Sequence, residues 1–184
     1  MVKYGQNTFK CTYTPDNTTN YKIVTGLDVT IKVTGKITEK LTVNIEKYIT
    51  KMSEDGSTIY LTGIEAETSL EEFQKQIKTN GTIDIYEKNG TKATDMQAKA
   101  KTGMKLEIKK ETEKITYILV VTGDNNGDGK FNSVDLLKLA RYLADLDKNL
   151  EKEYLYACDV HKNEKVNQAD LLKMARVMSG LDKF

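Results

Sequence analysis

The sequence predicts a multidomain α+β protein in which a β-rich N-terminal part precedes an all-α C-terminal part built from two loop–helix repeats. The first observation behind this prediction is a change of composition. All 22 threonines lie at or before Thr122, whereas leucine rises from 6 residues in the first 122 to 10 in the last 62. Because β-branched residues favour strands and leucine favours helices, the border falls near residues 122–123. The second observation is an internal duplication beyond this border.

The β-rich part shows the alternation of apolar and polar residues that is typical of half-buried strands. This alternation is clearest over residues 27–33 and 41–45. Further strands are expected at residues 82–87, 104–108 and 115–121, with a turn at Asn89-Gly90.

One helix is expected to interrupt these strands. Ser69 and Glu72 have the spacing of a capping box, and Leu70, Phe73 and Ile77 then fall on one face. Asn80-Gly81 is expected to end the helix.

The duplication joins residues 124–145 (DNNGDGKFNSVDLLKLARYLAD) to residues 159–180 (DVHKNEKVNQADLLKMARVMSG) at an offset of 35. Nine of the 22 positions are identical, and Leu-Asp-Lys follows both copies. Each copy opens with polar, oxygen-bearing residues and continues as a helix with a wide apolar face. The two copies are therefore expected to fold alike.

The opening of the first copy has the pattern of a calcium loop. A hard divalent cation takes six to eight oxygen ligands, which a 12-residue loop supplies from positions 1, 3, 5, 7, 9 and 12. Gly129 stands at position six, where the sharp turn needs a positive φ. The predicted Ca²⁺ ligands are Asp124, Asn126, Asp128, the backbone carbonyl of Lys130, Asn132 and Asp135.

The second copy is a degraded version of the same loop, with candidate ligands Asp159, His161, Asn163, Lys165 through its carbonyl, Asn167 and Asp170. An imidazole nitrogen at position three is a poor ligand for a hard cation. Glu164 replaces glycine at position six, where a positive φ costs on the order of 1 kcal/mol. Two outcomes stay open: weak calcium binding, or a loop that keeps its shape without metal.

The segments before the loops indicate which calcium-binding class this is. A conventional EF-hand has a helix on both sides of its loop, but ITYILVV before Asp124 reads as a strand. Loop-then-helix twice, with Asp at position 12 and a DLLKLAR-type helix start, resembles the type I-like dockerin domain over residues 122–184.

The dockerin resemblance implies a non-catalytic module that folds with calcium and docks onto a cohesin. The cohesin would belong to a scaffoldin or a cell-surface protein, and the unbound chain would be a monomer. Such docking places secreted bacterial proteins in extracellular or cell-surface complexes such as cellulosomes, which serve polysaccharide catabolism.

The same resemblance implies which residues contact the partner. Loop positions ten and eleven would select it, namely Ser133 and Val134 in the first copy and Gln168 and Ala169 in the second. These pairs differ from the Ser-Thr pair common in cellulosomal type I dockerins and from each other, so one binding orientation is expected to win. Leu137 or Leu172 would be an apolar anchor or plain core, and the polar contacts would be Lys138, Arg141, Lys173 and Arg176.

Two further resemblances concern the β-rich part. Residues 37–121 resemble the X-type β modules that precede dockerins in some Gram-positive bacteria, through YLTGI at 60–64, the capped helix, TIDIY at 82–86 and KTGMKL at 101–106. Such modules imply a stabilising role. Residues 1–36 resemble the closing strands of bacterial immunoglobulin-like repeats in the stretch NTFKCTYTPDNTTNYKIVTGLDVTIKV; the alternative is that they are leading strands of the next module.

Composition argues against several other functions. A net charge of +1 without a basic run excludes a nucleic-acid partner, and the apolar stretch 115–121 is far short of the roughly 20 residues of a membrane span. The only histidine lies in a loop of the duplication, so an enzyme is not expected. The alternative function is a carbohydrate-binding or adhesion accessory fragment with a calcium-stabilised C-terminal domain, given 10 Tyr but no Trp.

Overall fold

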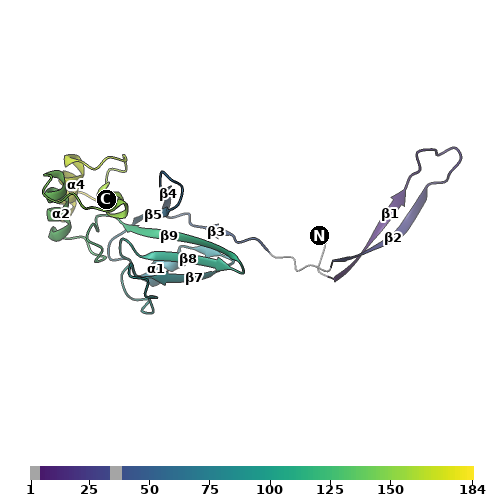
Figure 1. Ribbon diagram of the computed structural model, residues 1–184, viewed down its shortest axis with the longest axis horizontal. Coiled ribbons are helices and arrows are strands. Elements are labelled where there is room, and N and C mark those ends of the chain that lie inside the picture. The colour runs from purple at the N-terminus through teal and green to yellow at the C-terminus, as the bar shows by residue number, and fades with distance from the viewer. Residues whose placement is uncertain (1–4, 34–38) are drawn as a thin grey trace. The chain divides into compact units, whose positions relative to one another are not determined.

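The computed structural model describes residues 5–33 and 39–184, and it divides the chain into two compact units, Met1–Lys40 and Leu41–Phe184 (Figure 1). In the first unit, strands β1 (Gly5–Tyr13) and β2 (Val24–Val33) pair antiparallel as a hairpin, with Phe9 opposite Val29. The strand expected at 27–33 is confirmed as part of β2. Both apolar side chains of the Phe9–Val29 pair stay exposed. The boundary at residue 36 and the immunoglobulin-like origin stay predictions.

The second unit is built around a five-stranded sheet with the order β4-β5-β9-β8-β7 (Figure 1). Strand β9 pairs in parallel with β5 and antiparallel with β8, which makes it the central strand. A separate short ladder joins β3 to β6. The strands are β3 (Val43–Asn44), β4 (Ile49–Met52), β5 (Ile59–Ile64), β6 (Lys78–Thr79), β7 (Thr82–Tyr86), β8 (Lys105–Lys110) and β9 (Glu113–Val121).

Most of the strands expected in this unit are confirmed within a residue or two. The strands expected at 82–87, 104–108 and 115–121 correspond to β7, β8 and β9. The strand expected at 41–45 shrinks to the two residues of β3, because only these pair with β6.

Helix α1 (Leu70–Lys75) begins at the predicted capping box. The Ser69 hydroxyl accepts a hydrogen bond from the Glu72 N–H at 3.2 Å, and the Glu72 carboxylate accepts one from the Ser69 N–H at 3.1 Å. Phe73 is fully buried in the main core between this helix and the sheet. The helix ends earlier than the expected Asn80-Gly81 because the chain turns into β6 instead.

Three helices follow the sheet: α2 (Ser133–Leu143), α3 (Lys152–Cys158) and α4 (Gln168–Met178). Helices α2 and α4 pack on each other, and the fully buried Leu139 and Met174 share one apolar cluster between them. Helix α3 packs against β5 and β9, where Ala157 is buried with Tyr60 and Val120. No helix of the described residues is long and apolar enough to span a membrane.

The predicted fold class is wrong where it treats the C-terminal part as an all-α module separate from the β-rich part. The structure is a mixed α/β fold. Strand β9 ends two residues before the first loop, and α3 covers part of β5 and β9. The physical reason is that α3 has an apolar side that the other two helices do not cover, so it is buried against the sheet. The composition changes at Thr122, but α3, which follows this residue, packs against β5 and β9, which precede it, so Thr122 is not a boundary between separate cores.

Candidate metal and docking site

The first loop is organised around the buried carboxylate of Asp124, which two residues separate from β9. One carboxylate oxygen accepts hydrogen bonds from the backbone N–H groups of Gly127 at 2.8 Å and Asp128 at 3.0 Å. The other accepts from the N–H groups of Gly129 at 3.1 Å and Thr102 at 2.9 Å. Thr102 precedes β8, so the sheet region also holds this loop in place.

Gly129 has the backbone conformation that was predicted for position six. Its φ is +80°, and a Cβ built there would lie 2.9 Å from the carbonyl oxygen of Ala100. A side chain would therefore be opposed both by the left-handed conformation and by the neighbouring backbone.

Asp135, at position 12, connects the loop to the start of α2. One of its carboxylate oxygens accepts a hydrogen bond from the Asn125 N–H at 3.1 Å, and the other from the Asn132 N–H at 3.0 Å. The Asn132 side chain caps the helix by accepting from the Val134 N–H at 2.8 Å. The acidic loop and the beginning of the helix thus form one hydrogen-bonded structure.

The remaining predicted ligands of the first loop lie nearer the solvent. The Asn126 amide donates to the Asp128 carboxylate at 3.1 Å, and the same carboxylate accepts from the Lys130 N–H at 2.8 Å. Across residues 5–33 and 39–184, no three or more His, Cys, Asp and Glu side chains are grouped so as to hold a metal ion.

The chemistry of this set fits a hard cation. All its side-chain donors are carboxylate or amide oxygens. Burial raises the pKa of Asp124, and burial together with the charges of Asp124 and Asp128 raises the pKa of Asp135 to about 6. Within the described residues no lysine or arginine pairs with Asp135 or Asp124 to offset these charges. A divalent cation is the kind of group that would stabilise both carboxylates in their charged form.

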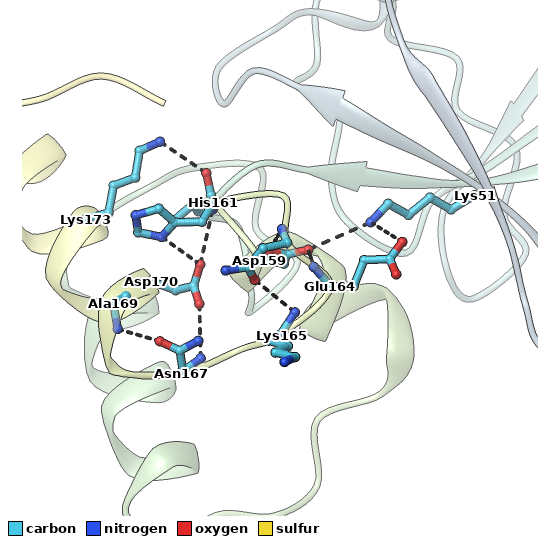
Figure 2. Close-up of polar contacts among 11 residues, drawn as sticks. Lys51, Asp159, His161, Glu164, Lys165, Asn167, Ala169, Asp170 and Lys173 are labelled. Atoms are coloured by element: carbon cyan, nitrogen blue, oxygen red, sulfur yellow. Dashed lines mark hydrogen bonds and ion pairs between the residues drawn. The ribbon is translucent and has the colours of Figure 1, made fainter.

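The second loop repeats this hydrogen-bond pattern with different residues (Figure 2). The Asp159 carboxylate accepts from the N–H groups of Asn163 and Glu164, both at 2.9 Å. The Asp170 carboxylate accepts from the Asn167 N–H at 3.0 Å and lies 3.2 Å from the His161 ring nitrogen Nδ1. Glu164 has a φ of +65°, the strained conformation that its place at position six implies. Lys165 is exposed, and its N–H donates to the Asn163 side chain at 3.1 Å.

The first turns of α2 and α4 are near copies of each other. The capping residues Asn132 and Asn167 have φ of −150° and −151°, and each is paired with an aspartate in a complete capping box. Leu137 and Leu172 occupy equivalent positions and are each 61% exposed, so neither is plain core. The other predicted selectivity residues, Ser133, Val134, Gln168 and Ala169, are exposed as well.

The two helix faces differ in how their basic residues are engaged. The Lys138 ammonium lies 5.0 Å from the Tyr154 ring centroid, whereas the Lys173 ammonium donates to the Val160 carbonyl at 3.2 Å. The corresponding arginines, Arg141 and Arg176, are both exposed, and Arg176 pairs with Asp182 at 3.5 Å. The two copies are therefore similar in sequence, but the basic residues on their exposed helix faces make different contacts.

Three residues that hold the loops were not predicted from the sequence. Thr102 binds the Asp124 carboxylate, and Lys51 lies beside the second loop. The buried Asn125 amide donates to the Asp135 carbonyl at 2.8 Å and to the Cys158 sulfur at 3.3 Å. Its own oxygen has no hydrogen-bond partner among the residues that the structure describes. Thr102 and Lys51 lie far from the loops in sequence, and no motif marks any of the three.

The geometry defines a class before any comparison: a protein with two loop–helix repeats, in each of which an asparagine caps the helix and an aspartate completes the capping box behind a polar loop. Strand β9 leads into the first loop, and α3 leads into the second. Residues 122–179 match the family model described as "Dockerin type I domain". The chain therefore carries a type I dockerin domain at its C-terminus. Dockerins are non-catalytic modules that bind calcium and dock onto cohesins. No curated protein and no solved structure matches the chain.

Proposed function

We propose that this chain is a calcium-dependent docking module that binds a cohesin and thereby anchors a secreted bacterial protein in an extracellular or cell-surface complex. The observation that carries the proposal is the hydrogen-bonded unit formed by the first loop and α2. Asp135 is buried in the loop and also completes the capping box of the helix. The exposed Val134 and Leu137 follow from the same turn. Whatever stabilises the loop therefore also fixes the apolar side of α2.

Calcium in this proposal is structural. The ion would be held by Asp124, Asn126, Asp128, Lys130, Asn132 and Asp135. It would supply positive charge to the buried carboxylates of Asp124 and Asp135, whose pKa values burial raises. The chain itself holds the loop conformation through the backbone N–H groups that bind Asp124, and Asn132 caps the start of α2. Because binding requires the folded loop, its free energy adds to the free energy of folding.

The partner surface is proposed to be the first half of α2 or of α4, with one orientation preferred. Val134 and Leu137 in the first copy, and Leu172 in the second, offer exposed apolar surface for anchoring. Arg141 and Arg176 border these positions and would steer carboxylates of the cohesin more than anchor them. Lys138 and Lys173 make different contacts, one with the Tyr154 ring and the other with the Val160 carbonyl, and this difference supports the preference for one orientation.

The β-rich residues 37–121 are proposed to be an X-type module that stabilises the dockerin, and residues 1–36 the end of an immunoglobulin-like repeat. Support for the first comes from the Thr102 N–H, which binds Asp124, and from Tyr60 and Val120, which bury Ala157 of α3. The second rests on the sequence resemblance and on a hairpin with exposed apolar residues, since an isolated two-stranded hairpin is marginally stable.

The experiment that tests the docking function is a binding screen of the full chain against a panel of cohesins, with calcium and with excess chelator. We expect at least one cohesin to bind in calcium and to be released by chelator. Insoluble glycans run in parallel serve as the competing ligand class. Retention on glycans, with no cohesin bound, would contradict the proposal and favour the carbohydrate-binding alternative.

The preferred orientation is tested with two paired variants: Val134→Asp with Arg141→Ala, and Ala169→Asp with Arg176→Ala. We expect one pair alone to weaken binding at least tenfold, or about 1.4 kcal/mol, while the other leaves it nearly unchanged. If binding survives each pair and falls only when all four changes are combined, the two faces are interchangeable and the preference is refuted.

A further inference from the structure

The second loop has a cation of its own, supplied by the sheet. The ammonium group of Lys51, on β4, lies 3.8 Å from a carboxylate oxygen of Asp159 and 3.8 Å from one of Glu164 (Figure 2). The Asp159 side chain is only 4% exposed, so its charge needs a partner. The same ammonium lies 5.2 Å from the ring centroid of Tyr156 on α3, which adds a cation–π contact.

Asp170, at the other end of the loop, also has its hydrogen-bond donors within the chain. One carboxylate oxygen of Asp170 receives both the backbone N–H of His161 at 3.1 Å and the His161 ring nitrogen at 3.2 Å. Figure 2 shows the imidazole turned toward this carboxylate. The side chain at position three is thus engaged with the side chain at position 12, in the place where a calcium loop would offer two oxygens to the ion.

The donor set of the second loop does not fit calcium for two further reasons. An imidazole nitrogen is a poor ligand for a hard cation, and it replaces an oxygen of the first loop. Glu164 holds the left-handed turn at a cost, and its carboxylate faces Lys51 instead of the loop interior. The first loop differs on each count, since Asn126 stands at position three with an amide oxygen and Gly129 makes the turn.

We propose that the second loop takes no calcium and that the ammonium of Lys51 replaces the ion, fastening the second repeat to the edge of the sheet. The chain then binds one calcium, and its second repeat depends on β4 for its shape. Only the count of one rests on the proposed function; the role of Lys51 does not.

The first arm of the test is the calcium stoichiometry of the full chain, measured by isothermal titration calorimetry after chelator treatment. We expect one site. Two sites would overturn the inference. A count of zero would contradict the proposed calcium dependence alone, and the second arm would still decide the role of Lys51.

The second arm compares Lys51→Met with the matched control Lys152→Met. Lys152 also lies over the Tyr156 ring, at 5.6 Å, but its carboxylate partner is the exposed Glu54 at 3.4 Å. In saturating calcium we expect Lys51→Met to lower the melting temperature by about 3 to 6 °C and the control by less than about 1 °C. Backbone amides of residues 159–170 should also exchange hydrogen faster in Lys51→Met only.

A third variant, Lys51→Arg, keeps the positive charge and guards against a general folding defect. It should retain most of the melting temperature and the amide protection of the second loop. Equal behaviour of Lys51→Met and Lys152→Met, with an unchanged second loop, would overturn the inference.

Discussion

The contact between α3 and the sheet predicts that the dockerin and the β-rich part unfold together, and Val120→Ala tests it. Val120 is 1% exposed, on β9, beside Ala157 of α3. The change removes two buried carbons, each contributing about 0.8 kcal/mol, so we expect a loss of about 2 kcal/mol once a small cavity is included. For a unit of this size that corresponds to about 6 °C in melting temperature. Val134→Ala is the matched control: Val134 is 55% exposed, and its loss should stay within about 0.5 kcal/mol.

The assay is differential scanning calorimetry in calcium. Parallel melts are monitored by the helical signal in far-ultraviolet circular dichroism and by tyrosine fluorescence. Tyrosine is informative here because the chain has no tryptophan and Tyr60 and Tyr156 lie at this contact. We expect residues 41–184 to unfold in one transition that Val120→Ala shifts in both signals. A helical transition that stays in place while a separate sheet transition moves would refute the reasoning.

Three further predictions concern single groups. Asp124→Ala should lower stability in calcium by about 3 kcal/mol or more and should abolish the further loss that chelator causes in the unaltered chain, both measured by thermal melts. Burial raises the pKa of Tyr48 and Tyr117 in the folded state, so the stability linked to them should be intact below their unfolded pKa of about 10 and lost as the pH rises above it, which alkaline unfolding curves and ultraviolet tyrosinate titration would show. Cys158 is fully buried and its pKa is raised to about 12 by burial, so mass spectrometry should find an alkylating reagent on the exposed Cys11 at once and on Cys158 only after unfolding.

Local signals were enough to predict most elements of the fold. The Ser69–Glu72 capping box marked the start of α1, and short runs with apolar residues at alternate positions marked β7, β8 and β9. The parallel pairing of β5 with β9 could not be predicted, because about fifty residues and four other elements separate the two strands, and no local pattern specifies such a partner. The same limit explains the wrong all-α prediction: the apolar side of α3 is visible in the sequence, but the surface that covers it is not.

The candidate site likewise has features that the local sequence predicts and others that depend on contacts distant in sequence. The spacing of Asp124, Gly129 and Asp135 is contained in 12 residues, so the loop, its positive φ and its connection to α2 could be anticipated. Thr102 and Lys51 reach the two loops only through the folded sheet, and each is an ordinary polar residue in its own segment. Sequence reasoning therefore found the repeat and missed the contacts that make its two halves different.

The most direct test of the central claim is the affinity of the full chain for its best cohesin as a function of free calcium concentration. Surface plasmon resonance with the cohesin immobilised would give this affinity at each calcium level, with Asp124→Ala as the comparison. The account predicts that affinity rises with calcium to a plateau, falls to background in chelator, recovers when calcium is restored, and stays low at every level for Asp124→Ala. An affinity that does not change with calcium, or an Asp124→Ala variant that binds like the unaltered chain, would contradict it.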